Sequence, residues 1–455
     1  MPVNKKYLFS CIVLALLLCF AQIRGSSLLI MMCLGAYLLL LGWACSHNCT
    51  LPILLFFLPW STLMKLSPTS FSTYTFGLVL SCGISVFRNR LRLKRYALLS
   101  SIVILCLTLF SKLLDGSGLA FSYMAFLMML VLLPAVKQES RMETYDFYQV
   151  TLFYSLGIIL AALCALWFAS YPNIAQYIRV DTYNVVLRRS GFYGDANFYT
   201  AQITAALGGC LFLLLHEIRR SRLLLLVLIF ALVYCGAMSG SKSFVLVTAC
   251  VVLAWLYNLV LLRNHPWLKV LLLLAFGVFA GFIATSDLFR DLIEVLDVRF
   301  SRTTDFNSFT TNRAELWVSY VNELFTDVKV FFLGKGFTNI KVNGRGSHNT
   351  ILQLFYQFGM VGAPFLLYWN LYFLREGIRG GRNHEKSRQH VLPVLLGVYL
   401  PWLAIDLLFF DDFFLLQWYV FTAMQQQSQP PIRKVFRQGE PKPATMHALT
   451  QLRRE

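Results

Sequence analysis

The segment 344–362 reads GRGSHNTILQLFYQFGMVG and joins a basic, polar loop to an apolar helix. Its His348 has the most useful chemistry, because a neutral imidazole near pH 7 can accept a proton from a hydroxyl group. Ser347 or Asn349 could instead simply cap the helix, and capping does not require the imidazole. The segment therefore predicts either a general base at the start of a helix or a capped helix with an incidental histidine.

The spacing after His348 suggests how the side chain would be oriented. His348 and Gly359 are eleven residues apart, which is about three helical turns, so a continuous helix would place both on one face. Gly362 falls near the same face, and glycines there would let a neighbouring helix approach closely. The pattern predicts that His348 points into a helix bundle.

Arginines recur in the segments that precede this helix. Arg188 and Arg189 end a long polar segment, and Arg313 follows in a second one. Guanidinium groups present paired donors that match phosphate oxygens, so these residues are candidates for binding an anion. The alternative for the first pair is an ion pair with Asp181 or Asp195.

The segment around Arg313 has the signature of a helix start. Thr310, Thr311 or Asn312 can cap it, and Glu315 would complete a capping box if Asn312 is the cap. Arg313 would then lie in the first turn, which is unfavourable for a cation unless an anion is shared with the helix N-terminus. The alternative is an exposed surface arginine.

Two further glycine-containing turns carry cations. GAMSGSKSF contains Lys242, and FFLGKGFTNI contains Lys335 between Gly334 and Gly336. The second turn is too short for a phosphate loop of the Walker type. Lys242 and Arg345 are candidates to assist in anion binding, together with the amides of Asn197 and Asn349.

The composition defines the elements that must position these residues. The chain is 57% hydrophobic and 14% charged, with a mean hydropathy of +0.62. Apolar runs of roughly 18 residues or more recur throughout, and each is long enough to cross a membrane. The sequence predicts an all-α polytopic membrane protein. The net charge of +18 is explained by cations in cytoplasmic loops, and no nucleic-acid partner is expected.

Length and apolarity predict about 14 membrane spans. They lie near 7–23, 27–45, 51–65, 71–86, 97–114, 118–136, 149–169, 196–215, 222–238, 243–262, 267–285, 350–374, 391–408 and 412–426. Cations concentrate in the loops on the side of the two termini, which places the termini in the cytoplasm. His348 is then the only histidine on the outer side, so no metal site is expected there.

This topology divides the chain into three parts. Residues 1–170 form N-terminal spans, 171–426 form the region with the candidate site, and 427–455 form a cytoplasmic tail of disordered composition. Two outer segments, 171–195 and 286–349, are long, and the second is expected to contain short helices. Long segments held by a rigid scaffold are where function tends to lie.

The order of these motifs resembles the bacterial O-antigen ligase and O-antigen polymerase superfamily. The resemblance covers about 188 to 375. It rests on the following residues: Arg189, Gly191 and Asn197; Ser241 and Lys242; Arg313 and Trp317; Gly334 and Gly336; His348 and Asn349. His348, Asn349, Gly359 and Gly362 meet the ligase pattern, and His348 with Gly359 meets the polymerase pattern. Lys242 stands where many members have arginine, and Arg179 lies one residue too far from Gly191 for the paired polymerase motif.

The resemblance implies a glycosyltransferase of the bacterial inner membrane with its active site on the outer side. A glycan on undecaprenyl pyrophosphate would pass to an acceptor hydroxyl, without metal, nucleotide or other cofactor. His348 would be the base and Arg189 and Arg313 would stabilise the leaving group, with Arg188, Lys242, Arg345, Asn197 and Asn349 binding substrate. A chain-length regulator and a flippase of the same pathway are the protein partners it suggests.

The acceptor separates the alternatives within this class. A polymerase extends another lipid-linked repeat unit, whereas a ligase uses lipid A–core, and a protein O-glycosyltransferase is a third possibility. The predicted number of spans favours the polymerase. A transporter of lipid-linked sugars is the alternative of another class, supported by Asp406, Asp411 and Asp412 near the end of a predicted span.

Overall fold

The computed structural model defines most of the chain. It describes residues 4–45, 49–67, 70–115, 121–136, 146–178, 180–183, 186–216, 219–261, 266–286, 290, 293–294, 297–298, 300–301, 303, 305–310, 312–337, 342–380 and 391–426. The predicted cytoplasmic tail, 427–455, lies outside the described residues.

The regular elements of the described residues are helices apart from one small hairpin, and six of these helices are long and apolar enough to cross a membrane. They are α1 (Lys5–Arg24), α2 (Ser27–Cys45), α8 (Phe147–Trp167), α10 (Ala196–His216), α12 (Lys242–Leu261) and α18 (Thr350–Gly380). A helix pairs its backbone polar groups internally, which a hydrocarbon environment demands. The predicted class, a helical membrane protein, is confirmed, while the count of about 14 spans stays a prediction.

The remaining elements are shorter or less apolar. They are α3 (Thr50–Phe57), η1 (Leu58–Trp60), α4 (Thr73–Arg88), α5 (Arg95–Asp115), α6 (Phe121–Val136), α9 (Pro172–Ala175), β1 (Val180–Tyr183), β2 (Val186–Arg189), α11 (Arg219–Ala237), α13 (Pro266–Thr285), α15 (Phe306–Phe309), α16 (Arg313–Thr326), α17 (Val328–Leu333), α19 (Leu392–Tyr399), η3 (Leu400–Leu403) and α20 (Asp411–Gln426). Helices α15, α16 and α17 fall within 286–349, where short helices were expected.

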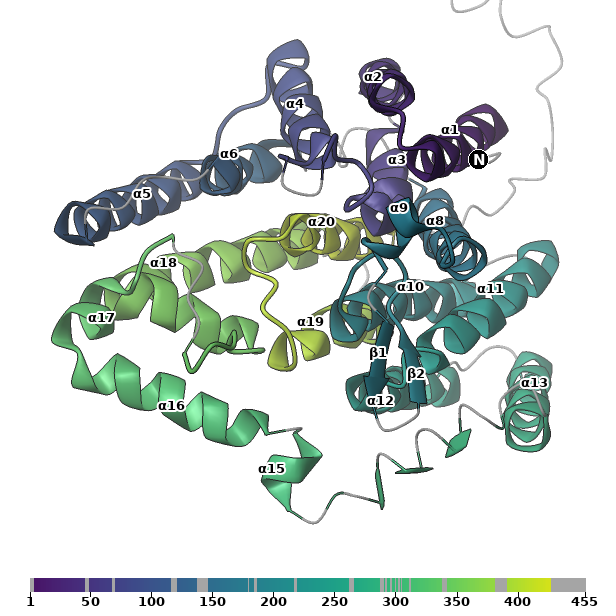
Figure 1. The fold of residues 1–455 in the computed structure, drawn as a ribbon. Helices are drawn as coiled ribbons and strands as arrows, with labels where there is room; N and C mark the ends of the chain where they lie inside the picture. Colours follow the sequence, from purple (N-terminus) through teal and green to yellow (C-terminus); the bar gives the residue numbers. More distant parts are fainter. Residues whose placement is uncertain are drawn as a thin grey trace, which may run out of the picture.

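The helices α3, α8, α10, α19 and α20 form the centre of the molecule, while α1, α2 and α13 lie at its edge (Figure 1). Glycines allow the close approaches at this centre. A Cβ added to Gly157 of α8 would come within 2.2 Å of the Phe56 carbonyl oxygen of α3, and one on Gly208 of α10 within 2.5 Å of the Pro393 carbonyl oxygen. The small residues therefore set the spacing of the central helices.

Large apolar side chains cover the outside of the peripheral helices. Phe9 of α1, Leu39 of α2, Leu253 of α12 and Val278 of α13 are each more than 60% exposed. Water would make such a surface unfavourable, whereas lipid tails would not. The distribution fits helices that face lipid.

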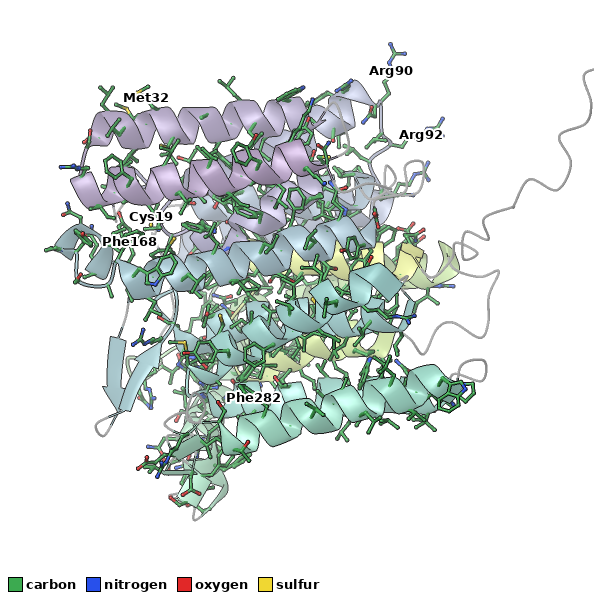
Figure 2. All side chains as sticks on the ribbon, turned by 90° about the vertical axis from the view of Figure 1, so that its right-hand side faces the viewer. Cys19, Met32, Arg90, Arg92, Phe168 and Phe282 are labelled. Atoms are coloured by element: carbon green, nitrogen blue, oxygen red, sulfur yellow. The ribbon has the colours of Figure 1, made fainter. Side chains whose placement is uncertain are left out.

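The ends of the bundle agree with the predicted topology. Arg90 and Arg92, in the loop after α4, lie at one end of the helices, and Phe168 and Phe282 lie toward the other (Figure 2). The sequence places the first pair on the cytoplasmic side and the second near the outer side. Which end faces the cytoplasm stays a prediction.

Two predicted spans form unusually short helices. α3 and α19 each end in a single 3₁₀ turn that contains Leu-Pro-Trp, at 58–60 and 400–402. Proline cannot donate the helical hydrogen bond and clashes with the preceding turn, so each helix ends early. The chain then continues as the loops 61–67 and 404–410, and the second carries Asp406 among mostly apolar residues.

Helix α18 is broken inside its apolar run. Gly359 has φ 59° and ψ −174°, outside helical geometry and in a region that glycine alone adopts readily. The break frees backbone carbonyls, and the turn after α17 satisfies two of them. The Lys335 N–H donates to the Tyr356 carbonyl at 3.1 Å and the Gly336 N–H to the Gln357 carbonyl at 2.7 Å.

This break overturns one prediction. α18 begins at Thr350, after His348, and its helical register is interrupted at Gly359. The prediction that His348 and Gly359 share one helix face is therefore wrong, because it requires one continuous helix. The close helix approach at Gly362 is present, since an added Cβ there would lie 2.9 Å from Leu107 Cδ1 of α5.

Candidate functional site

The loop before α18 is fastened to the loop after η3. Asp406 Oδ1 accepts hydrogen bonds from the Ser347 hydroxyl and, at 2.9 Å, from the Asn349 N–H. The Thr350 hydroxyl donates to the Ile405 carbonyl at 2.6 Å and accepts from the Leu407 N–H at 3.0 Å. These bonds join two segments almost sixty residues apart in sequence and fix the position of His348 between them.

The cap of α18 is Asn349 rather than Ser347. The Asn349 side-chain oxygen accepts from the Ile351 N–H at 3.0 Å and the Leu352 N–H at 3.1 Å. This satisfies two of the N–H groups that a helix start leaves unpaired. The proposed substrate-binding residue Asn349 thus has its amide oxygen occupied by the helix that it begins.

His348 occupies a constrained position among four charges. Its φ is 49°, a left-handed conformation that is uncommon for a residue with a side chain. Burial lowers the pKa of His348, and the neighbouring charge of Arg313 lowers it further, whereas Asp406 and Asp195 raise it and Arg345 lowers it. The net shift is downward, so the neutral imidazole persists below the usual pH range for histidine.

Arg313 projects from the first turn of α16 toward the same loop. Its Nη1 donates to the Ala404 carbonyl at 2.8 Å, two residues before Asp406. The capping box predicted for Asn312 is wrong, because Asn312 has φ 61° and makes no side-chain cap bond. The Thr310 hydroxyl instead accepts from the Ala314 N–H at 3.1 Å.

Two aromatic residues of α16 hold the backbone on the other side of His348. The Trp317 indole N–H donates to the Ser347 carbonyl at 2.9 Å, and the Tyr320 hydroxyl donates to the Arg345 carbonyl at 2.9 Å. Tyr320 is buried and packs edge-on against Tyr356 of α18. The His348 loop is therefore bonded to α16 and to the segment 404–407, while the Arg345 side chain remains exposed.

The predicted substrate-binding residues Lys242 and Asn197 form contacts within the protein. The Lys242 ammonium donates to the Thr303 hydroxyl at 2.8 Å and the Ser308 carbonyl at 3.3 Å. The Asn197 side-chain oxygen accepts from the Ser241 hydroxyl at 2.9 Å. Lys242 thus ties the start of α12 to the segment before α16, and Asn197 ties α10 to the turn before α12.

Arg189 lies at a different place from Arg313. Its N–H donates to the Met238 carbonyl at 3.1 Å, and its side chain lines a cavity of about 140 Å³ together with Tyr199 and residues at the end of α8. Arg189 is not among the described charged residues that shift the pKa of His348. Arg188 pairs with Asp181 in the register of the hairpin β1–β2, and its side chain lies outside the described part of the structure.

The candidate site includes two carboxylates, Asp195 and Asp406, that were not assigned to it from the sequence. Asp195 was considered only as a cap or ion-pair partner, and it does cap α10 by accepting from the Asn197 N–H at 2.7 Å. Asp406 was considered only as support for a transporter. The signal that could have found Asp406 is its location just after a Leu-Pro-Trp helix end, as the single charged residue of the segment 404–410.

The arrangement can perform proton transfer next to an anion. Neutral His348 can accept a proton, Arg313 and Arg345 supply positive charge beside it, and Asp406 orients the loop. In the part of the chain that the structure describes, no group of three or more His, Cys, Asp or Glu side chains could hold a metal ion.

The charges around His348 predict opposite shifts in pH dependence. Because Arg313 lowers the His348 pKa, Arg313→Gln should raise it and move the acid limb of the activity profile to higher pH. Asp406 raises this pKa, so Asp406→Asn should move the acid limb to lower pH. Rates of each variant across pH 4.5–8 measure the two shifts. Parallel shifts in one direction would exclude His348 as the titrating group.

No model of a known protein family matches the chain, and no curated protein matches it significantly. The role of the site therefore rests on the contacts and charges of its own residues.

Proposed function

We propose that the protein is a membrane glycosyltransferase that polymerises undecaprenyl-pyrophosphate-linked repeat units on the outer side of the bacterial inner membrane. The observation that carries the proposal is the convergence on His348 of Arg345, from its own loop, and of Arg313, from the first turn of α16, with the loop fixed by Asp406. A hydroxyl acceptor needs a base, and a pyrophosphate leaving group needs positive charge. His348 can meet the first requirement, and Arg313 and Arg345 can meet the second.

The proposed reaction balances with a single base. The acceptor hydroxyl oxygen forms a bond to the anomeric carbon of the donor sugar, and the bond between that carbon and the pyrophosphate oxygen breaks with its electron pair leaving on the pyrophosphate. His348 receives the hydroxyl proton and then releases it to solvent or to the leaving group. Its lowered pKa keeps the imidazole neutral and able to accept the proton at neutral pH.

The arginines would stabilise the negative charge of the leaving pyrophosphate. Arg313 is held through the Ala404 carbonyl and lies in the first turn of α16, so the guanidinium and the helix N-terminus together favour an anion. Preorganised cations stabilise the charge that develops on the leaving pyrophosphate without reorganising during the reaction. Arg345, exposed beside His348, can contact the same anion. Arg189 lies at a different place from Arg313 and Arg345, so it is less suited to bind the same phosphate.

The acceptor decides between the polymerase and its alternatives. A ligase would transfer the glycan to lipid A–core, and a protein O-glycosyltransferase would transfer it to a protein hydroxyl, with the same base and cations. Surface glycans from a deletion strain separate them. We expect single repeats on lipid A–core, as for a lost polymerase, whereas lipid-linked polymer that is not attached to core would indicate a ligase.

The aspartates that favoured a transporter have structural partners. Asp406 fastens the His348 loop, and Asp412 accepts from the Gln202 amide at 2.8 Å and from the Tyr193 hydroxyl. Asp411 accepts from the Thr75 hydroxyl at 2.7 Å. Acidic groups that carry these bonds do not require a transported ion to explain them.

Reconstitution tests the enzyme against the transporter. Purified protein in vesicles with a lipid-linked repeat unit should lengthen the glycan, which gel electrophoresis of the released chains measures. Movement of the lipid-linked unit between leaflets without any change in chain length would contradict a transferase and support the transporter.

A further inference from the structure

A cavity lined by aromatic and polar side chains draws most of its walls from the first part of the chain. Its volume is about 190 Å³, more than the roughly 30 Å³ that a water molecule occupies in the liquid. The cavity is lined by Ser61, Thr62, Lys65, Phe71, Ser72, Thr75, Ala125, Phe126, Met129, Tyr193, Phe409, Phe410, Asp411 and Phe414. It forms where α3 stops at Trp60 and leaves a polar loop in place of another helical turn.

The cavity contains a carboxyl group and an ammonium group that do not pair directly. Asp411 Oδ2 accepts from the Thr75 hydroxyl at 2.7 Å. Lys65 influences Asp411 through its charge, yet among the described residues the Lys65 ammonium makes no hydrogen bond or ion pair. A carboxylate and an ammonium held apart across a cavity offer one strong acceptor and one strong donor to a molecule between them.

The remaining walls suit a hydroxyl-bearing ring. Phe71, Phe126, Phe409 and Phe410 supply apolar faces, while hydroxyl groups lie at other points of the lining. A binding site of this kind combines mostly apolar walls with a few placed polar groups. A bare cation would be repelled by Lys65, and an apolar lipid chain would leave the Lys65 ammonium without a partner in the cavity.

Two segments of the chain contribute residues both to the cavity and to the candidate site. Tyr193 lines the cavity and Asp195, two residues later, acts on His348. Asp411 lines the cavity, and Asp406, five residues earlier, fastens the His348 loop. Phe410 also packs on Phe198, next to Asn197, with ring centroids 4.7 Å apart. Two short stretches of chain, 193–195 and 406–411, therefore connect the cavity to the candidate site.

We infer that this cavity is a subsite for a sugar residue of the glycan substrate, with the Asp411 carboxylate and the Lys65 ammonium bonded to its polar groups. The inference rests on the proposed function, because only a glycan substrate brings sugar rings to this end of the bundle. It assigns substrate recognition to residues of the segment 61–75, which the candidate catalytic region does not include.

Asp411→Asn and Lys65→Gln test the subsite in the full-length protein. Losing a hydrogen bond to a charged group should raise the apparent KM for the lipid-linked repeat unit about tenfold or more, with kcat changed much less. Leu66→Ala is the matched control, because Leu66 is 50% exposed and does not line the cavity. An unchanged KM in both variants would overturn the subsite.

A binding measurement separates failure of the subsite from failure of the proposed function. The probe is the free repeat-unit oligosaccharide, released from its lipid, and the readout is saturation-transfer NMR with purified protein. We expect binding to the wild-type and Leu66→Ala proteins and loss of binding to both cavity variants. Equal binding by all four proteins, or none by the wild type, would reject the sugar subsite. Absence of glycan transfer by a wild-type protein that binds the oligosaccharide would instead reject only the transferase.

Discussion

Replacing His348 with asparagine should reduce glycan transfer by about 10² to 10⁴-fold, the usual contribution of a general base. Asparagine is the informative substitution because His348 has φ 49°, and asparagine tolerates the left-handed conformation better than alanine does. The loop should therefore keep its shape while losing the imidazole. His348→Ala should also abolish transfer, with insertion into the membrane retained. Rates of chain extension with a purified lipid-linked repeat unit measure the loss.

The same loop provides a matched control. Asn343 is exposed and also has a positive φ, 52°, so Asn343→His makes the reverse exchange at a position away from the proposed base. This variant should extend glycans at the wild-type rate. A normal polymer ladder from a well-folded His348→Asn protein would exclude His348 as the base.

Replacing Gly359 with alanine should destabilise the protein by about 3 kcal/mol or more, from backbone strain and a steric clash. The residue has φ 59°, and an added Cβ would lie 2.4 Å from the Phe332 carbonyl oxygen. Backbone atoms cannot move aside as a flexible side chain can. The turn at Gly334 to Gly336 would be pushed from α18, which should lower the thermal midpoint by roughly 3 °C or more.

Gly42→Ala is the control for this experiment. Gly42 lies in α2, and nothing lies within 4 Å of an added Cβ there. We expect its thermal midpoint, measured by size-exclusion chromatography after heating in detergent, to stay near that of the wild type. A Gly359→Ala protein as stable as Gly42→Ala would mean that α18 is not broken at Gly359.

The sequence contained enough information for the membrane class and for several local features. Solid apolar runs require helices in lipid because backbone groups there must bond internally, and the predicted span 27–45 matches α2. Arg313 in a first helical turn, the turn at Gly334 to Gly336 and a cap at the start of α18 were also predicted. These features depend on residues close together in the chain.

Features that depend on distant segments could not be predicted in the same way. The break at Gly359 looked like part of a continuous apolar helix, because the N–H donors of Lys335 and Gly336 that satisfy the freed carbonyls lie more than twenty residues earlier. The hairpin β1–β2 was missed within a segment expected to be a loop. Hydropathy measures the preference of a segment for lipid, and says little about which backbone groups will meet.

Which residues lie together at the candidate site likewise depends on tertiary structure. Sequence alone indicated His348 and Arg313, but it paired them with Arg189, which the fold places beside another cavity. Asp406 joined the candidate site because the segment after η3 brings its carboxylate to Ser347 and Asn349. The chain determined which residues have reactive groups, and the packing of α16, α18 and η3 determined which of them share an environment. The physical reason is that charges and hydrogen bonds act over a few ångströms in space, whatever their separation in sequence.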